Sequence, residues 1–382
     1  MTDISTDSHR LAYIDNLRWS AISMVVVMHA AVTYSPFGAW YYREHPELSL
    51  GAKAAFAAYQ SLQHAVAMGL LFGIAGFFAA GAVARKGAAA FMRERLRRLG
   101  LPLLLYMAAI GPLTEYYVAG SWRSQPPRSF AEEWWRHLWS GEILDESGPL
   151  WFCLVLLLFS ACYAALCQAR PVRLAPSRPA SVAAVLGYAA AMASLTFALG
   201  AAWPNAGTVL NIDVHDFPQY PLMFAAGIAV WRGDWLRQIV PGVGRWWLWG
   251  GFAASAALWS ILVIAGGALQ GNVSVYGGGW HWQAAGMDAW RSFTCLALAL
   301  GLITLYRDRF GSRGVVAHFL TRNAFGVYVL HAPILIAITR ILHLWSTSVA
   351  IKFMVASVAG IVASFLVVGF IAQRTPGLRA VL

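Results

Sequence analysis

Runs of about twenty apolar residues recur along the whole 382-residue chain, and they constrain its fold more than any motif does. An α-helix needs roughly 20 such residues to cross the hydrocarbon core of a bilayer. The sequence predicts ten spans, at residues 17–36, 56–84, 101–119, 149–168, 181–203, 217–231, 246–268, 286–306, 320–342 and 348–372. We therefore predict an all-α polytopic membrane protein, a single domain over residues 1–382 with no separate soluble domain.

The composition excludes the other broad classes of protein. Hydrophobic residues make up 59% of the chain and charged residues 12%, whereas soluble proteins average roughly 45–50% and 25%. Too little polar surface is present to cover a soluble particle. The four cysteines lie inside apolar runs, which predicts small buried side chains rather than disulfides or a zinc site; they are Cys153, Cys162, Cys167 and Cys295.

The net charge of +11 is explained by membrane topology. With the N-terminus in the cytoplasm, 20 of the 28 basic residues fall on the cytoplasmic side, most densely over residues 85–98. The positive-inside rule then predicts that both termini are cytoplasmic, and no nucleic-acid partner is needed to account for the charge. The first basic residue, Arg10, follows Asp3 and Asp7, so we expect no cleavable signal peptide.

Two polar side chains share one face of the first span. Arg18 lies at its inner end and His29 follows eleven residues later, so their directions differ by only about 20° and they lie about 16 Å apart along the axis. An anionic ligand from the cytoplasm could bind Arg18 and extend to His29. The structural alternative is an Arg18 paired with Asp15 and a His29 hydrogen-bonded for packing, and the sequence leaves both open.

Three more titratable residues fall near the depth of His29. His64 lies in the outer part of the second span, Glu115 in that of the third and His331 in that of the ninth. Ionisable side chains are costly inside a bilayer and usually mark functional sites. Their shared depth predicts a common polar cavity, although depth alone does not show that these helix faces meet.

An arginine cluster precedes the third span. On a regular helix Arg95 and Arg98 are i,i+3 neighbours and form one basic face. Arginine suits bidentate phosphate contacts, but anchoring by the positive-inside rule is the simpler role. Asp213-Val214-His215-Asp216 has metal-binding residue types, yet few other ligands lie near it in sequence, so we predict no metal site. Residues 130–139 are expected to form a short helix on the outer membrane surface.

Five short patches occur in order along the chain. They are Tyr13-Ile14-Asp15-Asn16-Leu17-Arg18, the Arg18/His29 pair, Arg95-Leu96-Arg97-Arg98, Gly148-Pro149-Leu150-Trp151-Phe152 and Phe325-Gly326-Val327-Tyr328-Val329-Leu330-His331. Together they resemble the Y-x-D-x-x-R, R-x10-H, R-x-x-R, G-x-L-W-F and G-x-Y-x-x-H motifs of the acyltransferase-3 family of bacterial membrane O-acyltransferases. Trp19 and Ala332 depart from residues common in that family, which leaves the subgroup open.

The resemblance implies a multi-pass enzyme of the bacterial cytoplasmic (inner) membrane. It would transfer an acyl group, such as acetyl or succinyl, from cytosolic acyl-CoA to a hydroxyl of a carbohydrate or glycan acceptor. No permanently bound cofactor is expected, and homo-oligomer formation is left open. His29 would be the general base, because an imidazole suits proton removal near neutral pH. Glu115 or His331 would orient it or stabilise the developing charge.

The resemblance also assigns binding roles. Arg18, Arg95 and Arg98 would bind the phosphates of CoA, and Trp151 and His64 would contact the acceptor, although an interfacial tryptophan belt is the more ordinary role of such a residue. A polytopic transporter or exporter of a polar molecule or glycan is the alternative function, and a non-enzymatic scaffold is another. The sequence shows neither the paired repeats nor the interrupted helices typical of many transporters.

Overall fold

The computed structural model describes residues 11–44, 46–120, 128–169, 175–204, 207–311 and 314–375. Within these ranges the chain is almost entirely helical, and its strands are limited to the two-residue antiparallel pair β1 (Thr208–Val209) and β2 (Ile212–Asp213). Several arginines used in the topology prediction lie outside the described residues, namely Arg10, Arg123, Arg170, Arg173, Arg313 and Arg379.

Long helices dominate the described chain. The α-helices are α1 (Ala12–Tyr34), α2 (Leu50–Lys86), α3 (Ala88–Arg95), α4 (Leu101–Leu105), α5 (Gly111–Leu113), α6 (Phe130–Ser140), α7 (Trp151–Ala169), α8 (Val182–Ala202), α9 (Gln219–Gly233), α10 (Trp235–Gln238), α11 (Pro241–Ala265), α12 (Trp282–Arg309), α13 (Val315–His343) and α14 (Val349–Leu366). π-helical turns connect α3, α4 and α5 and extend α5 and α14.

Nine helical segments of the described chain are long and apolar enough to cross a membrane, which confirms the polytopic all-α fold. The expected sixth span is also helical, but α9 has 15 residues, or about 22 Å at ~1.5 Å per residue. That is shorter than the ~30 Å hydrocarbon core, so α9 falls short of a full span. The side of the membrane that each end faces stays a prediction.

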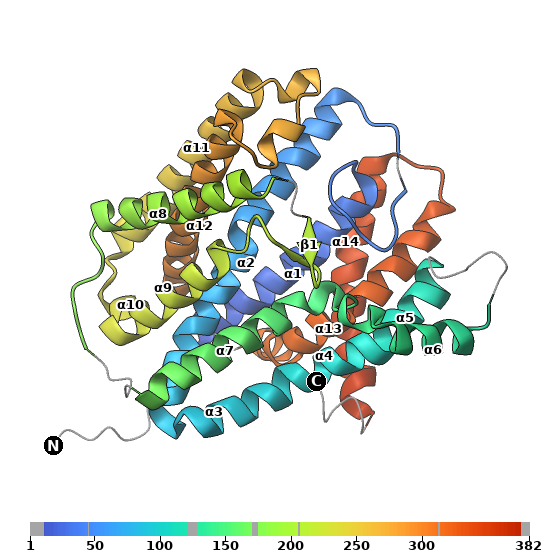
Figure 1. Ribbon diagram of the computed structural model, residues 1–382, viewed down its shortest axis with the longest axis horizontal. Helices are drawn as coiled ribbons and strands as arrows, with labels where there is room; N and C mark the ends of the chain where they lie inside the picture. The colour runs from blue at the N-terminus through green and yellow to red at the C-terminus, as the bar shows by residue number, and fades with distance from the viewer. Residues whose placement is uncertain are drawn as a thin grey trace.

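Glycines allow α9 to pack directly on α2. A Cβ atom on Gly76 would collide with the backbone carbonyl of Phe224, and one on Gly227 would collide with the carbonyl of Gly73. Small residues let helix backbones approach closely, which is how membrane helices gain packing energy without a hydrophobic driving force. The pair α2–α9 therefore forms a tight unit at the centre of the molecule (Figure 1).

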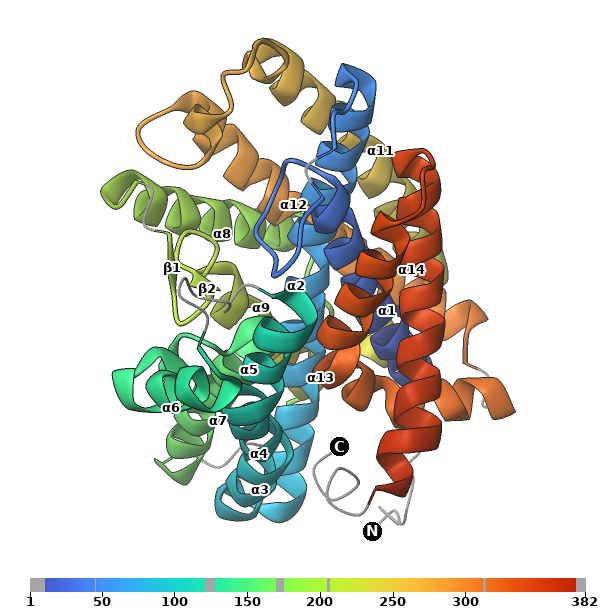
Figure 2. The same ribbon diagram turned by 90° about the vertical axis from the view of Figure 1, so that its right-hand side faces the viewer.

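Helix α1 lies inside the bundle. It packs against α2, α12, α13 and α14, and Figure 2 shows α1, α13 and α14 side by side, with α3–α7 gathered on the opposite flank. One continuous core of buried apolar side chains runs from Ile14 in α1 to Val368 after α14. This arrangement places both histidine-bearing helices of the resemblance, α1 and α13, next to each other.

Proline and π-helical turns interrupt the third span and explain how the surface helix α6 attaches. Pro112 cannot donate an N–H to the carbonyl of Ala108, and the N–H of Gly111 bonds to Tyr106 instead of Met107. The Trp134 indole donates to the Ala108 carbonyl at 2.7 Å, and His137 Nε2 bonds to the Met107 carbonyl at 3.2 Å.

Helix α6 itself confirms the helix predicted over residues 130–139. It begins with a capping box, in which Ser129 and Glu132 satisfy each other's backbone N–H groups. Its Trp135 and Trp139 side chains are exposed, as expected for a helix that lies at a membrane surface.

Candidate active site

Three rings from two helices and a loop meet at one point of the described structure. The His29 imidazole of α1 stacks on the Trp40 indole, with ring centroids 3.8 Å apart and planes 14° apart. The His331 imidazole of α13 lies 5.3 Å from His29 and 6.2 Å from Trp40. We refer to His29, Trp40 and His331 as the histidine centre. The sequence prediction that His29 and His331 share a site is thus consistent with their positions.

The hydrogen bonds of the histidine centre leave two imidazole nitrogen atoms without partners. His331 Nδ1 lies 2.7 Å from the carbonyl of Tyr328, and because a carbonyl only accepts, Nδ1 must carry the proton. His331 Nε2 is then a bare lone pair, and it is buried without a partner. His29 Nδ1 is also buried and unpartnered. Buried polar atoms are normally satisfied, and exceptions in native proteins call for an explanation.

The G-x-L-W-F and G-x-Y-x-x-H patches contact each other behind this centre. The Tyr328 hydroxyl donates to the carbonyl of Pro149, and the Tyr328 and Phe152 rings meet edge to face with centroids 6.1 Å apart. Pro333, two residues after His331, has no N–H to donate to Val329, so the backbone ladder of α13 is open at this point. The hydrogen bond to Pro149 and the ring contact with Phe152 fix Tyr328, whose carbonyl accepts a hydrogen bond from His331 Nδ1.

A cluster of tyrosines and carboxylates adjoins the histidine centre. Tyr41, next to Trp40 in the chain, has its hydroxyl 3.1 Å from that of Tyr106. Burial raises the pKa of the Glu146 carboxyl to about 8, and the charge of Glu115 and a hydrogen bond with it add to the shift. Glu115 is thus beside Glu146 and the tyrosine pair rather than in the ring cluster.

Gly148 is required where this cluster meets α7. Its φ is +49°, and a Cβ atom there would collide with the Tyr41 hydroxyl and the Tyr106 ring. A side chain at this position would therefore separate the two tyrosines. The glycine of the G-x-L-W-F patch has in this way a physical reason in the packing around the site.

His64 belongs to a different cluster. Its Nε2 bonds to Asp216, whose carboxylate also pairs with Arg291. Asp288 lies 3.6 Å from Arg291 and 3.0 Å from His215 Nε2. We refer to these five residues as the paired network. They come from α2, the loop before α9 and α12, and they do not join His64 to the histidine centre.

The arginines of the R-x-x-R patch face different surroundings. Arg98 is 75% exposed and pairs with Glu94 at 3.3 Å. Arg95 is half-buried against the Phe91 ring, 5.2 Å from its centroid, and lies within electrostatic range of both Arg18 and Arg98. A π-helical turn starts at Leu96, between the two arginines, so the regular α-helical spacing assumed for them does not hold there.

Arg18 and Arg95 thus form a pair of cations near the N-terminal end of α1. The Arg18 guanidinium lies 3.5 Å from Asp15 and its side chain is 42% exposed. No carboxylate pairs with Arg95 among the described residues. Two neighbouring positive charges favour an anion between them, which supports Arg18 and Arg95 over Arg98 as anion-binding residues.

Trp151 packs inside the bundle. Its ring lies 5.2 Å from Tyr220 and 6.3 Å from Phe72, centroid to centroid, which is the environment of a core residue rather than of an interfacial belt.

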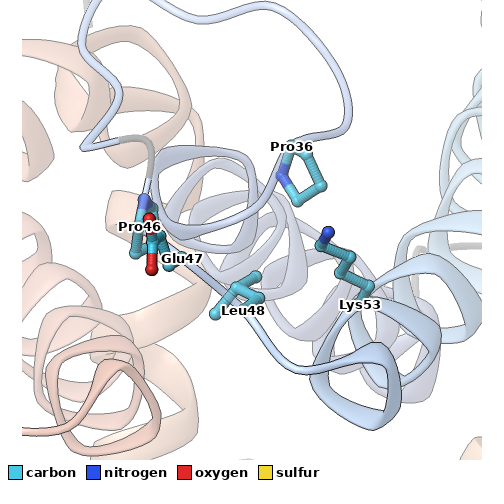
Figure 3. Close-up of a pocket in the computed structure, with 5 residues that line it drawn as sticks. All are labelled: Pro36, Pro46, Glu47, Leu48 and Lys53. Carbon is cyan, nitrogen blue, oxygen red and sulfur yellow. The ribbon is translucent and has the colours of Figure 1, made fainter.

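A cavity of about 470 Å³ opens just beyond the end of α1 and is lined by Pro36, Pro46, Glu47, Leu48 and Lys53 (Figure 3).

Sequence reasoning missed Trp40 and Glu146. Trp40 begins the aromatic run Trp40-Tyr41-Tyr42 directly after the first span, and that run was the available indication. Glu146 stands near Glu142 and Asp145, so it is not distinguishable in the sequence from a solvated loop acid. Among the described residues no group of His, Cys, Asp and Glu has the arrangement of a metal site.

Comparison with known proteins identifies the family of the chain. The sequence profile of the acyltransferase-3 family, described as an acyltransferase domain, matches residues 11–372. No curated protein and no solved structure matches the chain. The family match covers every patch from Tyr13 to His331, including both histidines of the centre. The chain therefore belongs to the acyltransferase-3 family and is a multi-pass membrane acyltransferase.

Proposed function

We propose that the protein transfers an acyl group, such as acetyl or succinyl, from cytosolic acyl-CoA to a hydroxyl of a carbohydrate or glycan acceptor, with His29 as the general base. Two unpartnered, buried imidazole nitrogens in adjacent rings carry this proposal. A packing role would satisfy those atoms with other groups. In the proposed relay they pair with each other, which leaves the remaining nitrogen of His29 with a lone pair for the proton that it removes.

The geometry supports a relay of the two histidines. The Tyr328 carbonyl fixes the proton of His331 on Nδ1, so His331 Nε2 can only accept. A small rotation brings the His29 Nδ1–H to that lone pair, and His29 Nε2 is then the free base. The second histidine in this way sets the tautomer of the first, as an orienting carboxylate does in other hydrolases and transferases.

The proposed reaction balances without any other reactant. His29 Nε2 removes the proton of the acceptor hydroxyl as its oxygen attacks the thioester carbonyl. The carbon–sulfur bond breaks, and the departing CoA sulfur takes the proton back from His29. The products are an oxygen ester and free CoA, and both imidazoles return to their starting protonation states.

The inner and outer ends of α1 serve the two substrates in this proposal. Arg18 and Arg95 bind phosphates of CoA on the cytoplasmic side, and the pantetheine arm runs along the ~16 Å to His29. The acceptor approaches from the other end, where the cavity of Figure 3 opens and where Tyr41 and Glu146 supply hydroxyl and carboxyl groups for hydrogen bonds to a sugar. The native membrane is then the bacterial inner membrane.

The test compares wild-type protein and His29→Ala in nanodiscs. CoA release from acetyl-CoA and succinyl-CoA is measured with methyl α-glucoside as a hydroxyl probe and with water alone. We expect His29→Ala to lower turnover by about 10²–10⁴-fold, the usual effect of losing an acid–base group, with unchanged yield and acyl-CoA binding. Near-normal turnover of well-folded His29→Ala protein would contradict the proposed base.

Topology is tested separately, in cysteine-free protein. Single cysteines at position 90 and at position 132 are labelled with a membrane-impermeant maleimide from each side. We expect cytoplasmic labelling at 90 and external labelling at 132. External labelling at 90 would place Arg95 on the wrong side for cytosolic acyl-CoA.

A further inference from the structure

We infer that Trp40 is a positioning residue for His29, an inference that rests on the proposed function of that histidine. The loop between α1 and α2 carries Trp40 back onto the helix that precedes it. Its indole fixes the plane of the imidazole so that one ring edge is held toward His331. Trp40 belongs to none of the motifs considered above and contacts the site only through its ring.

Trp40 stacks on one face of the His29 imidazole, and His331 does not lie on the opposite face. Trp40 lies 3.8 Å from His29 in a nearly parallel stack, and the 5.3 Å and 6.2 Å distances to His331 complete a triangle that is close to right-angled at His29. Trp40 therefore covers a face of the imidazole, while His331 lies beside an edge. The nitrogen atoms of an imidazole are on its edge, so the cover leaves them available.

Hydrogen bonding of the indole itself does not hold Trp40 in place. Its Nε1 is buried and has no partner, although a buried tryptophan N–H usually finds one. The stack on His29 and the anchoring of the loop must therefore fix the ring.

The loop that carries Trp40 is hydrogen-bonded to the C-terminal end of α1. The Glu44 N–H bonds to the carbonyl of Thr33 at 2.9 Å, and the Arg43 guanidinium donates to the carbonyl of Ser35 at 3.1 Å. Gln60 of α2 donates to the Ser35 hydroxyl at 2.7 Å. The loop thus closes on itself, and Trp40 lies within the closed part.

A nearly buried ion pair also ties the loop to α14. Glu44 and Lys352 of α14 lie 3.0 Å apart, and their side chains are 8% and 11% exposed. His343, on the same helix as His331, lies 3.7 Å from Glu44. The loop is therefore tied to the helix that supplies the second imidazole, and a change at Lys352 can disturb His29 without touching it.

The expected functional effect is on turnover and not on donor affinity. The relay needs His29 Nδ1 to face His331 Nε2, and rotation of the imidazole about its Cβ–Cγ bond removes that alignment. Trp40 restricts this rotation. Misaligned groups lower the rate of the chemical step, while the CoA phosphates at the far end of α1 are unaffected.

The experiment compares Trp40→Leu, Trp40→Phe and Lys352→Met with wild type in nanodiscs, with acetyl-CoA and methyl α-glucoside as probes. We expect Trp40→Leu to lower kcat about 10- to 100-fold with the KM for acetyl-CoA unchanged. Trp40→Phe keeps a flat ring and should recover most of kcat. Lys352→Met should lower kcat by a smaller factor. Trp280→Leu, at an indole that is 82% exposed, is the matched control and should behave as wild type.

A second readout does not depend on turnover. In protein labelled with ¹⁵N-histidine, the His29 ring signals are assigned by their loss in His29→Gln. The stacked indole should shift them upfield in wild type, and Lys352→Met should weaken that shift although Trp40 is still present. An unchanged shift in Lys352→Met would overturn the anchoring step.

Two kinetic outcomes would overturn the inference and leave the proposed function standing. Unchanged kcat in Trp40→Leu would show that the stack has no positioning role. A rise confined to the KM for methyl α-glucoside would make Trp40 a sugar-stacking platform instead. Full activity of His29→Ala, by contrast, would remove the proposed function itself, whatever the Trp40 variants do.

Discussion

The molecule holds two histidine clusters of opposite character. In the histidine centre, His29 Nδ1 and His331 Nε2 are buried without partners. In the paired network, the Asp216 carboxylate meets both His64 and Arg291, and Asp288 meets His215. Each cluster joins separate elements of the bundle, yet only one keeps unused hydrogen-bonding capacity. The difference distinguishes side chains whose polar atoms are used within the fold from the two histidines that we propose act on a substrate.

Electrostatics explain why the paired network is a structural feature. Burial alone would raise the pKa of Asp216, but the charge of Arg291 and the hydrogen bond with His64 outweigh burial and hold that pKa below its ordinary value. A hydrogen bond with Asp288 raises the pKa of His215 against the opposing effect of burial. Each ionised form is thus stabilised by the folded state, and by linkage each stabilises the folded state in turn.

The largest expected difference comes from matched histidine substitutions in the two clusters. His331→Ala removes the lone pair that orients His29, and we expect turnover per folded molecule to fall about 10²-fold or more. His215→Ala should lower Tm and leave turnover per folded molecule near wild type. CoA release and thermal unfolding of both variants check this, and equal loss of turnover in the two would end the distinction.

Breaking the paired network at its centre should have the largest effect on stability. Asp216→Ala leaves the mostly buried Arg291 with Asp288 as its remaining ion-pair partner among the described residues, and removing one partner of a buried pair costs about 3–5 kcal/mol. We expect a clear loss of Tm and of folded yield. Asp234→Asn, in an exposed pair with Arg237 at 3.8 Å, is the control and should change stability by under about 1 kcal/mol. Wild-type Tm and folded yield in Asp216→Ala would contradict a structural role for the network.

Arg95 and Arg98 show a similar contrast, because Arg98 pairs with Glu94 and no carboxylate of the described residues pairs with Arg95. Arg95→Lys keeps the charge but loses the planar fork, and losing a charge-assisted hydrogen bond of ~1.5–3 kcal/mol corresponds to a roughly 10- to 150-fold weaker acyl-CoA affinity. Arg98→Lys and Arg97→Lys should matter little, because Arg98 is exposed and paired with Glu94. Equilibrium binding of acyl-CoA to the three variants ranks them, and equal effects at 95 and 98 would refute the ranking.

The smallest expected effect is a dependence of stability on pH. The pKa of His215 is raised in the folded state, so its contribution is complete below its unfolded value of about 6.5 and is lost as pH rises through the folded value. As pH rises above about 6.5, Tm should therefore decline more in wild type than in His215→Gln. His281→Gln, at an exposed position, is the control, and parallel Tm curves for wild type and His215→Gln would contradict the linkage.

Much of the fold and part of the site were predictable from the sequence. Apolar runs identify spans because a bilayer requires long hydrophobic helices, and spacing along one helix places Arg18 and His29 on one face. Spacing fails at Arg98, because a π-helical turn changes the angle per residue. The failure there is local, and no pattern in the residues themselves announces it.

Partners supplied by other segments could not be predicted. His64 has the depth of His29, but its direction around α2 points it to Asp216 in a loop 152 residues away. Trp40 lies in a loop, where no periodicity indicates the direction of a side chain. The direction of each side chain depends on tertiary packing, and the predicted depth in the membrane does not determine that direction.

The attachment of α6 has a consequence for biogenesis. The carbonyls of Met107 and Ala108 in the third span receive their side-chain donors from His137 and Trp134, which the ribosome adds more than twenty residues later. A carbonyl left unsatisfied in hydrocarbon costs several kcal/mol, so the third span cannot settle in lipid as an independent unit. We expect the third span to reach its final packing only after α6 has been made, so that this part of the protein is completed as a pair and not helix by helix.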